Sequence, residues 1–135
     1  GTAERVKMEI GAARAPQDGV GLTTYVRGRD VGKGVPSEIT LSEAQVAEAV
    51  VEPVNRIIEV VRAALENTQP EIAADVIDEG ITMTGGGSLL RGISSVLQDE
   101  TGLPVRLAED PMNCVALGAG RTLEEPIYRG ALANA

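Results

Sequence analysis

Residues 81–88, with the sequence ITMTGGGS, place a short β-type run directly before three consecutive glycines. The composition of residues 81–84 is typical of a strand, and Gly80 ends the helical pattern before it. After the glycines we expect a helix over residues 88–100, followed by a second β-type run at residues 105–108. The apolar face of that helix is formed by Leu89, Leu90, Ile93 and Leu97. Strand, helix and strand in this order predict an α/β fold with a parallel sheet.

The glycine run Gly85–Gly86–Gly87 is a candidate ligand site because it follows a strand and opens a helix. Glycine lets a ligand approach the backbone closely, a helix N-terminus offers free N–H groups, and ligands bind at the carboxyl ends of parallel strands. The run is not a Walker loop, since no Gly-Lys-Ser/Thr follows, and Leu90 stands where a dinucleotide fingerprint needs its third glycine. A tight strand-to-helix turn with nothing bound is the alternative, and spacing alone favours it.

The first 41 residues predict a small helix and a hairpin, a modest α+β appendage to the α/β unit. A short helix over the first ten residues has an apolar face made of Ala3, Val6 and Ile10. Residues 20–27 and 35–41 each alternate with period two, and the glycine-rich residues 28–34 join them. Two such runs linked by a turn-rich stretch predict an antiparallel hairpin.

A long helix with an internal proline follows the hairpin. Ser42 and Gln45 have the spacing of a capping box, which predicts a helix start at Ser42. Pro53 lacks an N–H and clashes with the preceding turn, so we expect a break or kink at residues 51–52.

Two further helix starts are predicted from capping residues. Thr68 and Glu71 have capping-box spacing and predict a short third helix. Asp110 followed by Pro111 predicts the N-cap and first position of the last helix. The small residues 115–120 of that helix suit close packing, and Cys114 is expected to be a buried small residue.

The composition excludes several classes of function. The chain has 135 residues, about one domain, and its 43% hydrophobic content suffices for a core. Two Tyr and no Phe or Trp remove the aromatic platforms on which single-stranded nucleic acid stacks. A net charge of −8 argues against a phosphate-backbone or anionic-membrane footprint. We therefore expect no nucleic-acid partner.

The absence of His and the single Cys narrow the chemistry further. Without His the commonest general base and metal ligand are missing, and one Cys makes no internal disulfide, which favours a reducing cytosol. No apolar run approaches about 18 residues and no charged-then-apolar leader opens the chain, so we expect neither a membrane span nor a secretory signal. The chain begins with Gly1 rather than Met, which suggests a fragment.

The remaining polar candidates are few. Glu4 and Lys7 lie one helical turn apart and can present a hydrogen-bonding pair to a polar ligand, although the helical pattern alone favours a solvated face. Asp75, Asp78 and Glu79 lie near a predicted helix end, and no further residues with the spacing of metal ligands accompany them. No metal site is therefore predicted. No paired carboxylates or nucleophile–base pair can be argued, and no catalytic residue is predicted.

Several motifs occur together along the chain. They are residues 2–11 (TAERVKMEIG), 28–30 (GRD) with 34–36 (GVP), 52–54 (EPV), 81–92, 108–111 (AEDP) and 114–118 (CVALG). In this order they resemble the MreB family, bacterial actin homologues that organise cell-wall synthesis. The resemblance extends over nearly the whole chain, to about Glu125.

The resemblance implies an α/β, actin-like ATPase fold of the ribonuclease H-like superfamily, in which two lobes close on a nucleotide. This chain corresponds to the C-terminal portion only. Residues 1–41, a helix plus a hairpin, are expected to form the end of subdomain IIB. Residues 42–125 are expected to form the C-terminal part of subdomain IIA, and residues 126–135 a tail.

The resemblance also implies nucleotide contacts on two segments. The residues expected to meet the ribose and adenine of ATP or ADP are Glu4, Arg5, Val6 and Lys7. Those expected to line the nucleotide from the opposite side are Gly85, Gly86, Gly87 and Ser88. A carboxylate can accept from ribose hydroxyls, a lysine stem can cover the base, and glycine permits close backbone contact. Val6 stands where the family commonly has Ile.

The family's two phosphate loops, and the residues that position water and Mg²⁺, lie upstream of the segment matched here. The family's membrane-inserting elements lie upstream as well, so the resemblance implies no direct membrane insertion from this segment. Phosphoryl transfer depends on positioning and charge neutralisation, so we expect this chain alone to bind nucleotide weakly or not at all and not to hydrolyse ATP. Without the strands that precede residue 1 in the family, uncovered sheet edge and apolar surface predict self-association.

The resemblance implies that the intact protein binds ATP, polymerises into membrane-associated filaments and maintains rod cell shape. Its expected place is the cytoplasm, at the inner face of the cell membrane. Its expected partners are further copies of itself, a RodZ-type membrane adaptor and the cell-wall elongation machinery. The alternatives are another actin-superfamily ATPase, such as a chaperone or sugar kinase, or a protein-interaction module that binds no nucleotide.

Overall fold

The computed structural model describes residues 1–128 and 130. The elements before the glycine run are α1 (Thr2–Ile10), β1 (Thr23–Arg29), β2 (Pro36–Ser42), α2 (Glu43–Ala49), α3 (Val51–Glu66), α4 (Pro70–Glu79) and β3 (Ile81–Met83). The elements that follow Gly85, the first glycine of the run, are η1 (Gly86–Leu89), α5 (Ile93–Thr101), β4 (Val105–Leu107), α6 (Cys114–Glu124) and η2 (Pro126–Tyr128). Of the predicted tail, residues 126–128 form η2, and residues 129 and 131–135 lie outside the described part.

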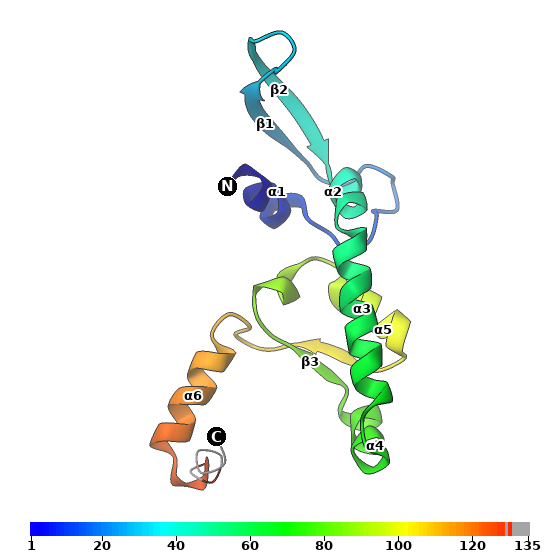
Figure 1. Ribbon diagram of the computed structural model, residues 1–135, viewed down its shortest axis with the longest axis vertical. Coiled ribbons are helices and arrows are strands. Elements are labelled where there is room, and N and C mark those ends of the chain that lie inside the picture. Colours follow the sequence, from blue (N-terminus) through cyan, green and yellow to red (C-terminus); the bar gives the residue numbers. More distant parts are fainter. Residues whose placement is uncertain (129, 131–135) are drawn as a thin grey trace.

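The molecule is elongated, with the hairpin at one end and α4 at the other (Figure 1). The helix α3 runs along its length between these ends, and α6 projects to one side (Figure 1). No helix in the described part of the chain is long and apolar enough to cross a membrane.

The predicted hairpin is confirmed. Strands β1 and β2 pair antiparallel, in a register that runs from Thr23 opposite Ser42 to Arg29 opposite Pro36. The helix before the hairpin is also confirmed, and on its apolar face Val6 and Ile10 are buried. Ala3 is exposed, so that face is narrower than predicted.

The capping box at the start of α2 is present, with Ser42 and Gln45 each accepting a hydrogen bond from the other's backbone N–H. The helical break lies at Val50, one residue before the predicted position. Pro53 is the third residue of α3. It is tolerated there because N–H groups in the first turn of a helix have no intrahelical acceptor.

The core is formed where α3 and α5 cover the two-stranded sheet, and it is aliphatic. Strands β3 and β4 pair in parallel, Ile81 opposite Val105, with α5 in the connection between them. The parallel α/β unit predicted from the sequence is therefore confirmed. The buried cluster consists of Ala13, Val54, Ile58, Ile93, Val96 and Leu97.

The single helix predicted over residues 88–100 is wrong. The glycine run leads into the 3₁₀ turn η1, Leu90 is extended, and α5 begins only at Ile93. Gly92 has a φ of +76°, a left-handed conformation that an α-helix cannot continue through. Of the predicted apolar face, Leu89 is exposed, Leu90 is half-buried, and Ile93 and Leu97 lie in the core.

The capping box predicted at Thr68 is also wrong. The N-cap of α4 is Gln69, without a side-chain hydrogen bond, and Pro70 occupies the first helical position. The Thr68 hydroxyl instead donates to the Ala64 carbonyl at 2.7 Å, at the end of α3. The side chain therefore bonds to the helix it follows rather than to the one it precedes.

The last helix begins later than predicted. Asn113, not Asp110, is its N-cap, and the Asp110 carboxylate accepts from the Asn113 side-chain amide at 3.0 Å. Asp110 and Pro111 form a turn before α6 rather than its first residues. Cys114 is half-buried rather than buried, and no residue of α6 is buried.

Candidate functional site

The two polar side chains singled out on α1 pair with each other. Lys7 Nζ lies 2.8 Å from Glu4 Oε1, and both side chains are about half exposed. Val6 between them points the other way and is buried, with 6% of its surface exposed. The helix therefore fixes its position through Val6 and presents Glu4 and Lys7 to solvent.

Arg5 faces the hairpin. Its Nη1 donates to both carboxylate oxygens of Glu9 at 2.9 Å, and its Nη2 donates to the Tyr25 carbonyl at 3.3 Å. The Thr24 hydroxyl donates to Glu9 as well, at 2.7 Å. These bonds hold the pKa of Glu9 below its ordinary value, the Thr24 bond contributing most and Arg5 next. Arg5 thus docks α1 on β1.

The glycine run is held at its two ends. Gly85 has a φ of +77° and a ψ of 171°, a backbone conformation available essentially to glycine alone. Its N–H donates to the Pro111 carbonyl at 2.6 Å, which ties the run to the segment after β4. At the other end, the buried Ser88 hydroxyl donates to the Gly85 carbonyl at 2.6 Å and closes the turn.

Between these ends the backbone is open. A Cβ on Gly85 or Gly87 would meet no atom within 4 Å, and one on Gly86 would meet only Met112, whose sulfur would lie 3.3 Å away. Within the described part of the chain, neither the Gly86 nor the Gly87 amide donates a hydrogen bond. Free amides beside glycine Cα atoms suit the close approach of a polar or anionic ligand.

The two predicted sets, residues 4–7 and 85–88, are not bonded to each other directly. No hydrogen bond or ion pair among the described residues joins them. They lie on the same side of α3 (Figure 1). The chain after α1 runs beside the chain after η1, through a parallel bridge between Ala12 and Arg91. The sets therefore have a fixed spatial relationship, but the connecting contacts lie outside both.

Sequence reasoning missed the residues that make these connections. Pro111 and Met112 were predictable in principle, because they follow β4 and the carboxyl ends of neighbouring parallel strands meet at one edge. Arg91 and Glu43 form an ion pair at 3.3 Å across elements far apart in the sequence, and no local pattern indicates it.

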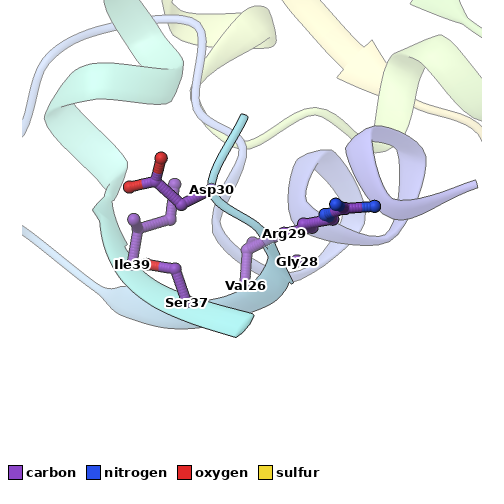
Figure 2. A pocket seen from close by; sticks show the side chains of 6 residues that line it. All are labelled: Val26, Gly28, Arg29, Asp30, Ser37 and Ile39. Atoms are coloured by element: carbon purple, nitrogen blue, oxygen red, sulfur yellow. The ribbon is translucent and has the colours of Figure 1, made fainter. Parts of the chain in front are cut away.

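Two hollows lie away from these residues. One of about 220 Å³ lies at the hairpin and is lined by Val26, Gly28, Arg29, Asp30, Ser37 and Ile39 (Figure 2). Its charged groups are engaged in the turn, because Asp30 accepts the Gly32 and Lys33 N–H groups and Arg29 donates to the Gly34 carbonyl. The other, of about 300 Å³, is largely apolar and lies between α3, α4 and β3.

Within the described residues, no group of three or more Cys, Asp or Glu side chains is placed to hold a metal ion. Asp75, Asp78 and Glu79, near the end of α4, are accordingly solvated acids.

The family described as MreB/Mbl protein matches residues 1–128 of this chain. The cell shape-determining protein MreB of Escherichia coli (strain K12) is 48% identical over 123 residues, which is 91% of this chain and 35% of that protein. The chain thus spans about 35% of the length of that relative.

Solved structures give the same result. MreB5 of Spiroplasma citri bound to ADP matches with a TM-score of 0.84 and 33% identity, over 99% of this chain and 40% of that one. MreB5 bound to AMPPNP matches with a TM-score of 0.83 and 33% identity, over 98% of this chain and 39% of that one. The α/β fold is actin-like, and the chain belongs to the MreB/Mbl family.

Proposed function

We propose that this chain is the C-terminal portion of an actin-like cytoskeletal ATPase. The intact protein would bind ATP with Mg²⁺, polymerise into filaments associated with the inner membrane and maintain rod cell shape by organising cell-wall synthesis. The observation that carries the proposal is the match to ADP-bound MreB5, with a TM-score of 0.84 over 99% of this chain. The name of the E. coli relative, a cell shape-determining protein, supports the same role.

The proposed division assigns residues 1–41 to the end of subdomain IIB, residues 42–125 to the C-terminal part of subdomain IIA and residues 126–135 to a tail. The hairpin and α1 lie together at one end of the molecule, which supports a separate first unit (Figure 1). The aliphatic core is contributed mainly by α3 and α5, which supports a second unit built around the parallel sheet.

In the proposed nucleotide site, Glu4 accepts from the ribose hydroxyls and the stem of Lys7 covers the base. Arg5 and Val6 hold this helix in place, on β1 and in the interior respectively. Gly85, Gly86, Gly87 and Ser88 line the opposite side, with the open Gly86 and Gly87 amides available to polar atoms of ADP or ATP. The half-exposed Glu4–Lys7 pair supports this assignment, because neither side chain is committed to the core.

The remaining proposed partners come from family membership alone. They are further copies of the protein within a filament, a RodZ-type membrane adaptor docked on subdomain IIA, and the cell-wall elongation machinery. The proposed location is the cytoplasm, at the inner face of the cell membrane.

The decisive experiment is sedimentation of the full-length protein that contains this chain, with and without ATP and Mg²⁺. We expect it to pellet above a critical concentration only with nucleotide, and to form filaments by electron microscopy. ATP consumption that requires a sugar, or that a peptide stimulates, without pelleting would instead indicate a kinase or a chaperone. Absence of nucleotide binding would indicate an interaction module.

The nucleotide contacts are tested with Lys7→Ala in the same protein. We expect its Kd for ADP to rise about tenfold, which corresponds to about 1.4 kcal/mol. The matched control is Lys33→Ala in the hairpin loop, which should leave the Kd unchanged. Equal affinities for the two variants would contradict the assignment of Lys7. The 135-residue chain itself should release no phosphate from Mg²⁺-ATP, because its residues contribute only part of the nucleotide site and neither phosphate loop.

A further inference from the structure

Arg91 contacts the segment after α1 and the start of α2 at the same time. Its carbonyl accepts from the Ala13 N–H at 2.8 Å, and its Nε donates to the Gly11 carbonyl at 3.2 Å. Its Nη2 lies 3.3 Å from Glu43 Oε2. The guanidinium therefore donates a hydrogen bond to a backbone carbonyl and forms an ion pair with a carboxylate at the same time, an arrangement that a lysine ammonium in its place would not reproduce.

Glu43 is the most enclosed carboxylate among the ion pairs of the described residues. Its side chain is 13% exposed, whereas the carboxylates of the other pairs are between 43% and 80% exposed. The same Oε2 accepts the Leu22 N–H at 3.0 Å. A Cβ on Gly21 would come within 2.8 Å of Glu43 Cβ, so the loop before the hairpin packs directly on this side chain. An enclosed carboxylate needs such partners to offset its lost hydration.

This ion pair lies at the junction of the two segments proposed to contact the nucleotide. Gly11 ends α1, and its N–H donates to the Lys7 carbonyl at 2.8 Å. Arg91 follows η1, whose first residues are Gly86 and Gly87. We call residues 4–7 and residues 85–88 the two walls of the proposed site. The bond from Arg91 Nε to the Gly11 carbonyl therefore joins two positions that each lie a few residues from one wall. This side-chain bond acts beside the backbone bond from the Ala13 N–H to the Arg91 carbonyl, and the two together set the separation of the two walls.

We propose that Arg91 and Glu43 are positioning residues for the nucleotide site. Glu43 orients the Arg91 guanidinium, and Arg91 holds the end of α1 at a set distance from the glycine run. Neither side chain need touch the nucleotide. Their loss leaves only the backbone bond between Ala13 and Arg91, so the walls can shift relative to each other and nucleotide affinity falls although every contacting residue is retained. The inference rests on the proposed function, because it assigns these residues to a site that the function requires.

The test uses the full-length protein below its polymerisation concentration, with ADP as the probe. Arg91→Gln removes the charge pair and the bond from Nε, and Glu43→Gln removes the charge but keeps an acceptor for the Leu22 N–H. We expect the Kd for ADP to rise about fivefold or more in Arg91→Gln and by less in Glu43→Gln. Arg91→Lys keeps the positive charge but loses the planar guanidinium, so we expect a rise in the Kd for ADP between those of the other two variants.

The matched control is Arg62→Gln. Arg62 also bonds a carbonyl and a carboxylate, both of Glu100, at 3.0 and 2.6 Å, but it joins α3 to α5 away from both walls. The control should lower thermal stability without changing the Kd for ADP. In the 135-residue chain, amide exchange at Ala13 should accelerate in Arg91→Gln and stay unchanged in Arg62→Gln, which reports the contact without any nucleotide.

The outcomes separate the two claims. ADP binding by the unmodified protein with unchanged affinity in the Arg91 and Glu43 variants would overturn this inference and leave the proposed function standing. Equal losses of affinity in Arg91→Gln and Arg62→Gln would also overturn it, because they would reflect stability alone. No ADP binding by the unmodified protein would overturn the proposed function and this inference with it. If Arg91→Gln does not fold, Arg91→Lys and Glu43→Gln decide the question.

Discussion

The Thr24 hydroxyl donates a 2.7 Å hydrogen bond to the Glu9 carboxylate, and this bond joins the first strand of the hairpin to α1. Arg5 donates to both oxygens of the same carboxylate. Hydrogen bonds to an ionised carboxylate favour its charged form, and they hold the pKa of Glu9 below its ordinary value. Docking of the hairpin on α1 is therefore coupled to the ionisation of Glu9.

Substitution of Thr24 tests the cause of the lowered pKa of Glu9. In Thr24→Val we expect the pKa of Glu9 to rise toward its ordinary value, because the largest cause of its depression is removed. Arg5→Gln should raise it by less. Carboxyl-carbon NMR titration measures the change, with Thr23→Val on the same strand as the matched control. An unaltered Glu9 titration in Thr24→Val would show that the hydrogen bond does not form in solution.

The same carboxylate predicts part of the acid sensitivity of the fold. Because the pKa of Glu9 is lowered in the folded chain, its ionised form stabilises the fold above its pKa in the unfolded chain. That contribution is lost as the pH falls through the lowered, folded-state pKa. Urea unfolding at several pH values should therefore show a shallower acid loss in Glu9→Gln than in the unmodified chain. The remaining loss should include Asp18, whose pKa is lowered by the N–H groups of Val20 and Gly21.

Three glycines should rank in a definite order when replaced by alanine. Gly80→Ala should cost the most, at least about 2 kcal/mol, because φ is +73° and a Cβ would collide with the Pro104 carbonyl oxygen. Gly85→Ala should cost about 1–3 kcal/mol from its φ of +77° alone, since nothing lies near its Cβ position. Gly87→Ala, with neither constraint, should cost less than about 1 kcal/mol. Urea unfolding midpoints of the three variants measure the order, and a larger loss in Gly87→Ala than in Gly85→Ala would contradict it.

Local patterns predicted those parts of the fold that local interactions stabilise. The capping box at Ser42 and the hairpin depend on residues close in sequence, and both are present. The helix expected from residue 88 failed because of a distant contact. The bridge between Ala12 and Arg91 holds the chain extended there, and Gly92 then starts α5 from a left-handed conformation. A periodicity of leucines cannot show which distant segment will pair with the backbone.

The same distinction holds for the candidate site. The glycine run follows a strand, so its place at the sheet edge was predictable, and Gly85 does adopt a glycine-only conformation there. Its anchoring by the Pro111 carbonyl and the ion pair between Arg91 and Glu43 depend on how segments far apart meet. Arginine and glutamate at single positions are ordinary surface residues by composition, and only tertiary structure encloses Glu43.

The interior should be sensitive to the removal of a single methyl group. Ile93 is 1% exposed and belongs to the cluster formed with α3. Ile93→Val should lower the free energy of unfolding by about 1 kcal/mol, since the packed neighbours cannot fully close the space. Ile77→Val on α4, where the side chain is 64% exposed, is the matched control and should change it by less than about 0.5 kcal/mol. Equal effects in urea unfolding would show that α5 does not pack as described.

The chain should associate with itself through α6. None of its residues is buried, its main contacts are with the short η2, and it projects from the rest of the molecule (Figure 1). Val115, Leu117 and Leu123 are 78%, 56% and 69% exposed, an apolar surface that water disfavours. Light scattering should therefore give a mass that rises with concentration, and Val115→Glu with Leu123→Glu should restore the monomer.

Gln98→Glu on the exposed side of α5 adds charge without removing apolar surface, so it should leave the association unchanged. A sharply monomeric mass of the unmodified chain at high concentration would contradict the prediction, because the net charge of −8 would then outweigh the apolar surface of α6.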